Sequence, residues 1–193
     1  FSDVVCRELH LEAPAPDLAD WEEMVERIRN RSEEVRIGLV GKYVKLHDAY
    51  LSVAEAMSHA GYEQNTFINI RWIDSETITK ENVEDMLADL DGVIVPGGFG
   101  NRGIEGMILA ADYAREHQIP YFGICLGMQC AVIEFARNVL GIADANSSEM
   151  ESTPHPVIDL MEEQKGVTAK GGTMRLGAYP CALKKGSKVA AAY

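Results

Sequence analysis

The sequence predicts an α/β fold with an open, mainly parallel β-sheet that has helices on both faces. Short, β-branched, nearly all-apolar runs recur along the chain, and segments with helical periodicity separate them. Because these runs are apolar on both of their faces, both faces of the sheet should be covered. The length of 193 residues suits one ordinary domain with a short appendage.

Residues 1–36 differ from the rest, and we interpret them as a tether and linker helix from an absent upstream domain. The run Ala13–Pro16 alternates alanine with proline, which disfavours a helix and favours an extended linker. A helix should follow, with Asp20 as its N-cap and Glu23 as the capping-box partner. The main domain is therefore expected to comprise residues 37–193.

Four apolar runs are expected to form the strands, because each is short and rich in β-branched residues. They are Val35–Lys42, Thr66–Ile73, Asp91–Pro96 and Ile119–Cys125. The segments that follow these runs place apolar residues three and four positions apart, as on one face of a helix. The predicted faces are Tyr50, Val53, Ala54 and Met57; Val83, Met86, Leu87 and Leu90; Ile104, Met107, Ile108 and Ala111; and Met128, Ala131, Val132 and Phe135.

The most informative chemical motif is Gly123–Gly127 (GICLG), between the last strand and the last helix. It has the form of the Gly-x-Ser-x-Gly nucleophile elbow, with cysteine in place of serine. Side chains two positions either side of the nucleophile would collide at such a turn, and the helix N-terminus stabilises a reactive thiolate. We therefore predict that Cys125 is a nucleophile rather than a core cysteine. Cys130 should lie in the core, and Cys6 and Cys181 have no such context.

A second motif, Pro96–Gly100 (PGGFG), directly follows another predicted strand. Adjacent glycines at a strand end allow backbone N–H groups to approach a ligand closely. An acyl-transfer site needs such donors for its oxyanion, and the N–H of Leu126, just after the nucleophile, would be the second donor. A plain tight turn is the alternative, but the position on the same sheet edge as the elbow favours function.

These motifs resemble the class I glutamine amidotransferases, and among them the amidotransferase part of CTP synthases. The matching segments are Val40–Ala56, Pro96–Met107, Gly123–Gln129, Asn146–Met150, His155–Met161, Gly171–Gly177 and the linker LEAPAPDLADW. The resemblance implies a flavodoxin-like sheet and a Cys–His–Glu triad that hydrolyses glutamine to glutamate and ammonia through a thioester. The ammonia would then aminate UTP to CTP in the ATP-using synthetase domain.

The resemblance also implies roles for individual residues. Cys125 would be the nucleophile, and Gly98 and Leu126 would form the oxyanion hole. Gln129 and Glu149 would hold the α-amino and carboxylate end of glutamine, with Gly98 also lining the substrate site. From the residues alone, Glu149 is only an acid in a polar loop.

Further implications of the resemblance concern regulation and partners. Asn101–Gly106 would be a mobile lid where GTP activates the reaction, with Lys42 and Arg102 as candidate GTP contacts. No cofactor is expected in this domain, whereas the full-length enzyme would use ATP and Mg²⁺. The partners would be L-glutamine, the upstream synthetase domain of the same chain and, in the full-length enzyme, other copies in a homo-tetramer.

A cysteine triad also needs a histidine, normally oriented by a carboxylate. The five candidates are His10, His47, His59, His117 and His155. His155 and Pro156 resemble the start of the family's His-Pro-Glu motif, but Val157 stands where the glutamate belongs. His47 follows a strand, although the family pattern does not use it as the base. We therefore expect the triad His and Glu beyond Tyr193, and poor glutamine hydrolysis by the 193 residues alone.

Composition excludes several other classes. The net charge of −12 opposes a domain-wide nucleic-acid surface, and no apolar run approaches a membrane span. No His/Cys cluster has metal-ligand spacing, and the cysteine pattern suits a reducing cytosol, so a cytoplasmic location is expected. Two alternatives stay open: a free-standing cysteine hydrolase, such as a γ-glutamyl hydrolase, and a non-catalytic amidotransferase-like module.

Overall fold

The computed structural model describes residues 1–161, 164–166, 178 and 180–192, and divides the chain into two units. The first unit, Phe1–Ile158, contains the sheet and its helices, and the second, Asp159–Tyr193, contains the short helix α7 (Lys188–Ala192). The segment Gly171–Gly177, which contributed to the family resemblance, lies outside the described residues. Within the described ranges, every helix is too short or too polar to cross a membrane.

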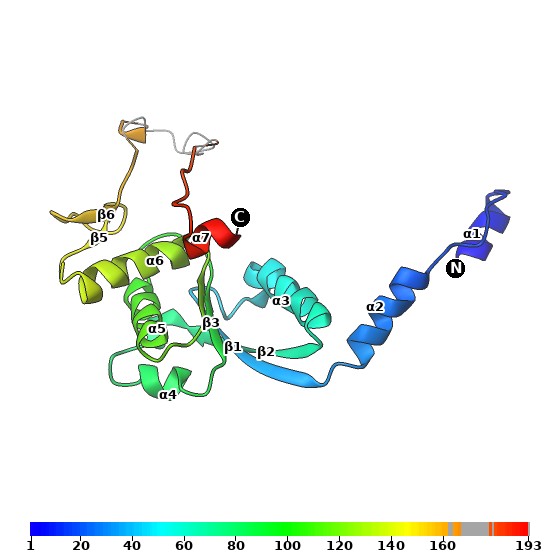
Figure 1. Ribbon diagram of the computed structural model, residues 1–193, viewed down its shortest axis with the longest axis horizontal. Coiled ribbons are helices and arrows are strands. Elements are labelled where there is room, and N and C mark those ends of the chain that lie inside the picture. The colour runs from blue at the N-terminus through cyan, green and yellow to red at the C-terminus, as the bar shows by residue number, and fades with distance from the viewer. Residues whose placement is uncertain (162–163, 167–177, 179, 193) are drawn as a thin grey trace. The chain divides into compact units, whose positions relative to one another are not determined.

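Four parallel strands form the main sheet in the order β2-β1-β3-β4 (Figure 1). They are β1 (Glu33–Gly41), β2 (Thr66–Asp74), β3 (Gly92–Val95) and β4 (Tyr121–Gly123). The predicted parallel sheet and its four strands are therefore confirmed. In the register, Gly41 of β1 lies opposite Asp74 of β2, and Val95 of β3 lies opposite Gly123 of β4. The loops that follow these strands consequently meet at one edge of the sheet.

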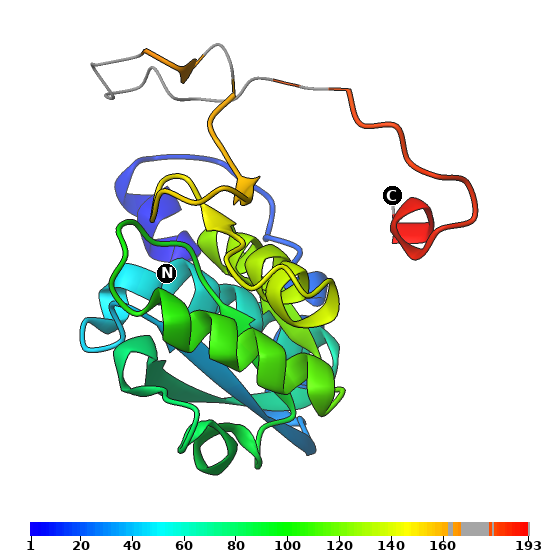
Figure 2. The ribbon, with the colours of Figure 1, turned by 90° about the vertical axis from the view of Figure 1, so that its left-hand side faces the viewer.

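Helices cover both faces of the sheet, as predicted (Figures 1 and 2). Helix α3 (Leu51–Glu63) packs on one face, and α5 (Ile104–Glu116), α6 (Leu126–Glu134) and the short α4 (Val83–Leu87) pack on the other. Adjacent residues of a strand point to opposite faces. Leu39 of β1 accordingly lies in the core with α3, whereas Val40 lies in the core with α5 and α6.

The buried face of α6 differs from the prediction, which placed Met128, Ala131, Val132 and Phe135 against the sheet. The buried apolar side chains of α6 are Leu126, Cys130 and Ile133, whereas Met128, Val132 and, just after the helix, Phe135 are 49%, 38% and 47% exposed. Nearly every position of this helix is apolar, so its periodicity does not single out one face. A π-helical turn (Phe135–Val139) extends α6.

The N-terminal segment contains two helices, α1 (Ser2–Glu8) and α2 (Ala19–Arg29). Helix α1 was not predicted, because the first residues show no clear hydrophobic period. Residues 11–18, which include the Ala/Pro run, contain no helix or strand, as predicted. Strand β1 begins at Glu33, before the expected domain start at residue 37, and that boundary stays a prediction.

The predicted N-cap of α2 is wrong. Leu18 occupies the N-cap position, and Asp20 lies inside the first turn. The carboxylate of Asp17 accepts a hydrogen bond from the N–H of Ala19 at 3.1 Å. Because Asp17 satisfies one of the first free N–H groups of the helix, the helix begins before Asp20.

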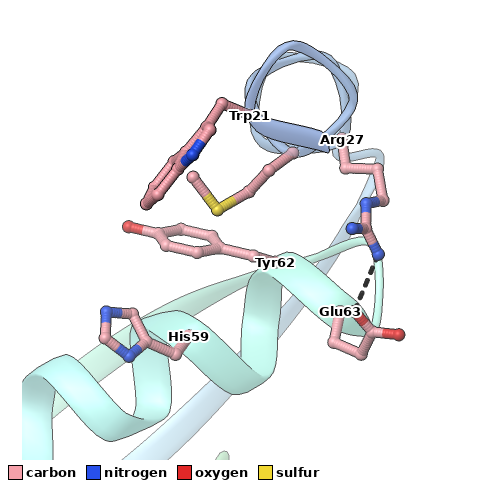
Figure 3. A pocket seen from close by; sticks show the side chains of 6 residues that line it. Trp21, Arg27, His59, Tyr62 and Glu63 are labelled. Atoms are coloured by element: carbon pink, nitrogen blue, oxygen red, sulfur yellow. Dashed lines mark hydrogen bonds and ion pairs between the residues drawn. The ribbon is translucent and has the colours of Figure 1, made fainter. Parts of the chain in front are cut away.

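Helix α2 lies against α3 across a hollow of about 390 Å³, shown in Figure 3. Trp21 from α2 and Tyr62 from α3 line this hollow. At one end, Arg27 donates a hydrogen bond to Glu63 at 2.8 Å. Aromatic surface and an ion pair thus attach α2 to α3.

A second, two-stranded parallel sheet forms after α6, in a region where the sequence pattern was weak. Its strands are β5 (Asn146–Ser147) and β6 (Pro156–Ile158). The N–H of Ser148 donates to the carbonyl oxygen of Ile158 at 2.9 Å. Because Val157 and Ile158 pack against the core of α5 and α6, this small sheet fixes the loop that follows β5.

Candidate active site

The strand-to-helix turn at Cys125 has the strained backbone that the sequence predicts. Cys125 occupies the N-cap of α6 with φ of 53° and ψ of −104°, which are uncommon values for a residue with a side chain. A Cβ atom on Gly123 would lie 2.4 Å from the carbonyl carbon of Gly127. A Cβ atom on Gly127 would lie 2.0 Å from the carbonyl oxygen of Val95. Only glycine fits at either position.

Tyr121 stabilises this turn, a role that sequence reasoning missed. Its hydroxyl donates a hydrogen bond to the carbonyl oxygen of Gly127 at 2.7 Å. Burial raises the pKa of Tyr121, so the hydroxyl stays protonated and remains a donor. The tyrosine thus ties β4 to the first turn of α6.

The cysteines differ sharply in environment. Cys125 is exposed to solvent at the helix N-terminus, whereas Cys130 is fully buried. Burial raises the pKa of the Cys130 thiol to about 12, so this cysteine stays a neutral thiol in the core, as predicted. Cys6 is half-buried and Cys181 is exposed in the second unit.

The glycine loop, Pro96–Gly100, follows β3 and faces the elbow. A Cβ atom on Gly97 would lie 3.5 Å from the Cβ of Cys125. A Cβ atom on Gly98 would lie 3.5 Å from Leu126 Cδ2. The loop backbone therefore runs close to both the thiol and the start of α6, as an oxyanion hole requires.

Cys125 opens into a hollow of about 150 Å³ at this edge of the sheet. Its lining contains all five residues that the resemblance assigned to catalysis and glutamine binding. The lining residues are Gly98, Phe99, Gly100, Asn101, Cys125, Leu126, Gln129, Glu149 and Met150. The sequence prediction of a shared site agrees with this grouping, while the role of each residue stays a prediction.

Two hydrogen bonds that sequence reasoning missed hold residues of the hollow's lining in place. The side-chain amide of Asn101 donates to the carbonyl oxygen of Met150 at 2.8 Å, which joins the glycine loop to the Glu149 loop. The hydroxyl of the buried Ser147 accepts a hydrogen bond from the N–H of Glu149 at 3.3 Å. Neither contact could be predicted from the sequence. The first joins residues far apart in the chain, and the second depends on the backbone path of an irregular loop.

Histidine is not part of the hollow's lining within the described ranges. The ring of His47 stacks on Trp72, with ring centroids 4.1 Å apart. His155 Nδ1 lies 2.8 Å from a carboxylate oxygen of Asp144, so this histidine does have an acidic partner, but both side chains are exposed and neither lines the hollow. Neither histidine therefore shares the hollow with Cys125, and the position of the base stays a prediction.

A separate open hollow of about 450 Å³ lies beside the glycine loop, where Lys42 and Arg102 were predicted to contact GTP. Its lining residues are Lys42, Tyr43, Lys45, Leu46, Ala49 and Arg102. Lys42 is only 4% exposed, and its ammonium is occupied by backbone carbonyl groups. Arg102 forms a 2.8 Å ion pair with Glu76. Lys42 is thus bound to the loop backbone and Arg102 is partly accessible, and a GTP contact of either residue stays a prediction.

Comparison with known proteins agrees with this geometry. The class I glutamine amidotransferase family model matches residues 45–192. The CTP synthase of Listeria innocua serovar 6a is 59% identical over 194 residues, and that of Carboxydothermus hydrogenoformans is 62% identical over 194 residues. Both alignments cover 100% of this chain but 36% of the relative, so the chain spans about a third of their length.

A solved structure supports the same assignment. The glutaminase domain of Trypanosoma brucei CTPS with bound acivicin superimposes with a TM-score of 0.64 and 43% sequence identity. The match covers 67% of this chain and 51% of that chain. Since the family model matches most of the chain and the structural neighbour shares its fold, this chain belongs to the class I glutamine amidotransferase family.

Proposed function

We propose that this chain is the glutamine-hydrolysing part of a CTP synthase, which aminates UTP to CTP with ATP and glutamine. The observation that carries the proposal is the hollow in which Cys125, at a strained helix N-terminus, meets the glycine loop, Gln129 and Glu149. The relatives that align with the whole chain are CTP synthases, which favours this activity over a free-standing hydrolase.

In the proposed reaction, the thiolate of Cys125 attacks the side-chain amide carbon of glutamine. The amide oxygen becomes an oxyanion, which the N–H groups of Gly98 and Leu126 stabilise. When the tetrahedral intermediate collapses, the C–N bond breaks, the nitrogen gains a proton and ammonia leaves. A γ-glutamyl thioester remains on Cys125, and water hydrolyses it to glutamate and the free thiol.

Other residues that line the hollow would orient the substrate. The carboxylate of Glu149 and the amide of Gln129 line it, and they suit the α-ammonium and α-carboxylate groups of glutamine. The proton for ammonia would come from a histidine oriented by a glutamate, as the family resemblance implies, and that pair belongs to a part of the protein outside the described residues.

The remaining substrates and partners belong to the full-length protein. ATP, Mg²⁺ and UTP would bind the upstream synthetase domain, and the full-length enzyme would be a cytoplasmic homo-tetramer. GTP would act as an activator at the hollow beside the glycine loop, where the cationic Arg102 and Lys45 and the aromatic Tyr43 suit a nucleotide.

Exchanging Glu149 for glutamine tests the proposal in a full-length protein that contains these 193 residues. If the carboxylate accepts from the substrate's α-ammonium, Glu149→Gln removes the charge and keeps the shape. Loss of a charge-assisted hydrogen bond of about 1.5–3 kcal/mol should weaken glutamine binding about ten- to a hundred-fold. CTP formation is measured once with glutamine and once with ammonium as the nitrogen source, and only the glutamine assay should suffer.

Glu151→Gln is the matched control, because Glu151 lies in the same loop but does not line the hollow. Its amide can still accept the 3.2 Å hydrogen bond from Asn146 Nδ2. An equal loss with both nitrogen sources would indicate a folding defect in Glu149→Gln. No loss with either source would reduce Glu149 to an ordinary surface acid, and a wild-type protein that forms no CTP would refute the proposed function.

A further inference from the structure

Lys42 lies directly after β1 and is buried beneath the glycine loop, with 4% of its surface exposed. Its ammonium donates hydrogen bonds to the carbonyl oxygens of Phe99, at 3.1 Å, and Gly100. Burial lowers the pKa of Lys42 from its usual value, because a buried ammonium loses its hydration. Such a group is kept inside a protein only where hydrogen bonds replace the lost water, and the two carbonyl groups do so here.

The backbone of Lys42 is itself held in place on both sides. Its N–H donates to the hydroxyl of the buried Tyr50 at 3.1 Å. Its carbonyl oxygen accepts a hydrogen bond from Arg102 Nη2 at 3.2 Å. The ammonium therefore extends from a fixed strand end, and it can hold the loop rather than follow it.

The lysine stem also lies against the predicted oxyanion donor. A Cβ atom on Gly98 would be 3.4 Å from Lys42 Cδ and 3.5 Å from Leu126 Cδ2, so Gly98 lies between the two side chains. A peptide group is planar, and a carbonyl held from one side fixes the direction of the N–H of the same peptide. By holding the carbonyls of Phe99 and Gly100, Lys42 thus fixes the N–H groups of Gly100 and Asn101, two residues that line the hollow. It also limits the movement of the neighbouring Gly98, against which its stem lies.

We propose that Lys42 is a positioning residue for the acyl-transfer step, because its ammonium holds the glycine loop beside Cys125 and so restrains the segment that carries the predicted oxyanion donor, the N–H of Gly98. This inference rests on the proposed function, since it concerns the same hollow. The buried positive charge also favours the negative charge that develops on the oxyanion. In this role Lys42 binds the glycine loop and makes no direct contact with an effector nucleotide.

The test compares Lys42→Met with the wild type in a full-length protein that contains these 193 residues. Methionine keeps most of the stem but removes the ammonium. Loss of one oxyanion donor costs about 10²–10³ in kcat, and a loosened donor should cost part of that, about 10- to 100-fold. The KM for glutamine should change by less than about three-fold, because Gln129 and Glu149 are untouched. Ammonium-dependent CTP formation should be unchanged.

A lysine-to-methionine change at the exposed Lys80 is the matched control and should alter none of these values. The inference would be overturned if Lys42→Met kept the wild-type kcat with glutamine. It would also be overturned if the rate of CTP formation fell equally with glutamine and with ammonium. A variant that loses only the response to GTP would also overturn it, since Lys42 would then be an effector contact.

A second readout separates this inference from the proposed function. Oxyanion donors polarise the carbonyl group of a bound glutamine-like chloroketone and so speed its alkylation of Cys125, whereas the small reagent iodoacetamide does not depend on these donors. Lys42→Met should slow labelling by the chloroketone about ten-fold or more and leave the iodoacetamide rate unchanged. If the wild type produces no ammonia from glutamine, the proposed function fails. The inference fails if the ratio of the two labelling rates is the same in both proteins.

Discussion

Gly127→Ala is expected to lower the free energy of unfolding by about 3–5 kcal/mol, at the upper end for a single substitution. The added Cβ would lie 2.0 Å from the carbonyl oxygen of Val95 and 2.8 Å from its carbonyl carbon. Both are backbone atoms of the central strand β3, so no side chain can turn away to make room. Helix α6 would have to move off the sheet, which would also displace Cys125. A urea denaturation curve, monitored by circular dichroism, measures the change in the free energy of unfolding.

Gly141→Ala is the control for the loss of a glycine as such. Gly141 has φ of 73°, but no atom of the described part of the chain lies within 4 Å of a Cβ atom added there. Its substitution should cost only the backbone strain of a left-handed residue, about 1–2 kcal/mol. Equal losses at the two positions would contradict the steric account of the elbow.

Cys125→Ala is expected to reduce glutamine-dependent CTP formation about 10⁴-fold or more, because no other group can form the thioester. Ammonium-dependent formation should be retained in a full-length protein that contains these residues, since ammonia bypasses the hollow. The control is Cys130→Ala, which removes a fully buried thiol and should cost some stability but neither activity.

The backbone at Cys125 adds a second readout to this experiment. Its φ of 53° is strained for any residue with a side chain, so Cys125→Gly should unfold at a higher urea concentration than Cys125→Ala. Cysteine at this position thus costs stability, which is expected where the strained turn serves catalysis. Equal stability of the two variants would indicate that the turn is relaxed.

The sequence predicted the sheet and the elbow because both depend on local, short-range rules. Apolar runs bounded by turns mark buried strands, and glycines at the second position on either side of Cys125 follow from contacts within the turn itself and with β3. The oxyanion loop was predicted for a related reason. Parallel strands end at one edge, so the loops after β3 and β4 must meet.

The features that were not predicted are those for which several three-dimensional arrangements fit the same sequence pattern. Helix α6 is apolar on nearly all sides, so only tertiary packing decides that Ile133 and not Met128 is buried. At the start of α2, Asp17 and Asp20 are both capable caps, and the sequence does not rank them. The position of Lys42 under the glycine loop depends on a contact between residues far apart in the chain, which no local rule predicts.

The most direct test of Cys125 as the nucleophile is chemical labelling followed by peptide mass mapping. The folded protein is treated with a glutamine-like chloroketone, and the modified cysteine is identified in the digested peptides. Cys125 is exposed at a helix N-terminus beside the glycine loop, whereas Cys130 is buried with its pKa raised to about 12. We expect label on Cys125 before Cys6, Cys130 or Cys181, and protection of Cys125 by added glutamine. Label that appears first on another cysteine, or at Cys125 with no protection by glutamine, would contradict the assignment of this hollow as a glutaminase site.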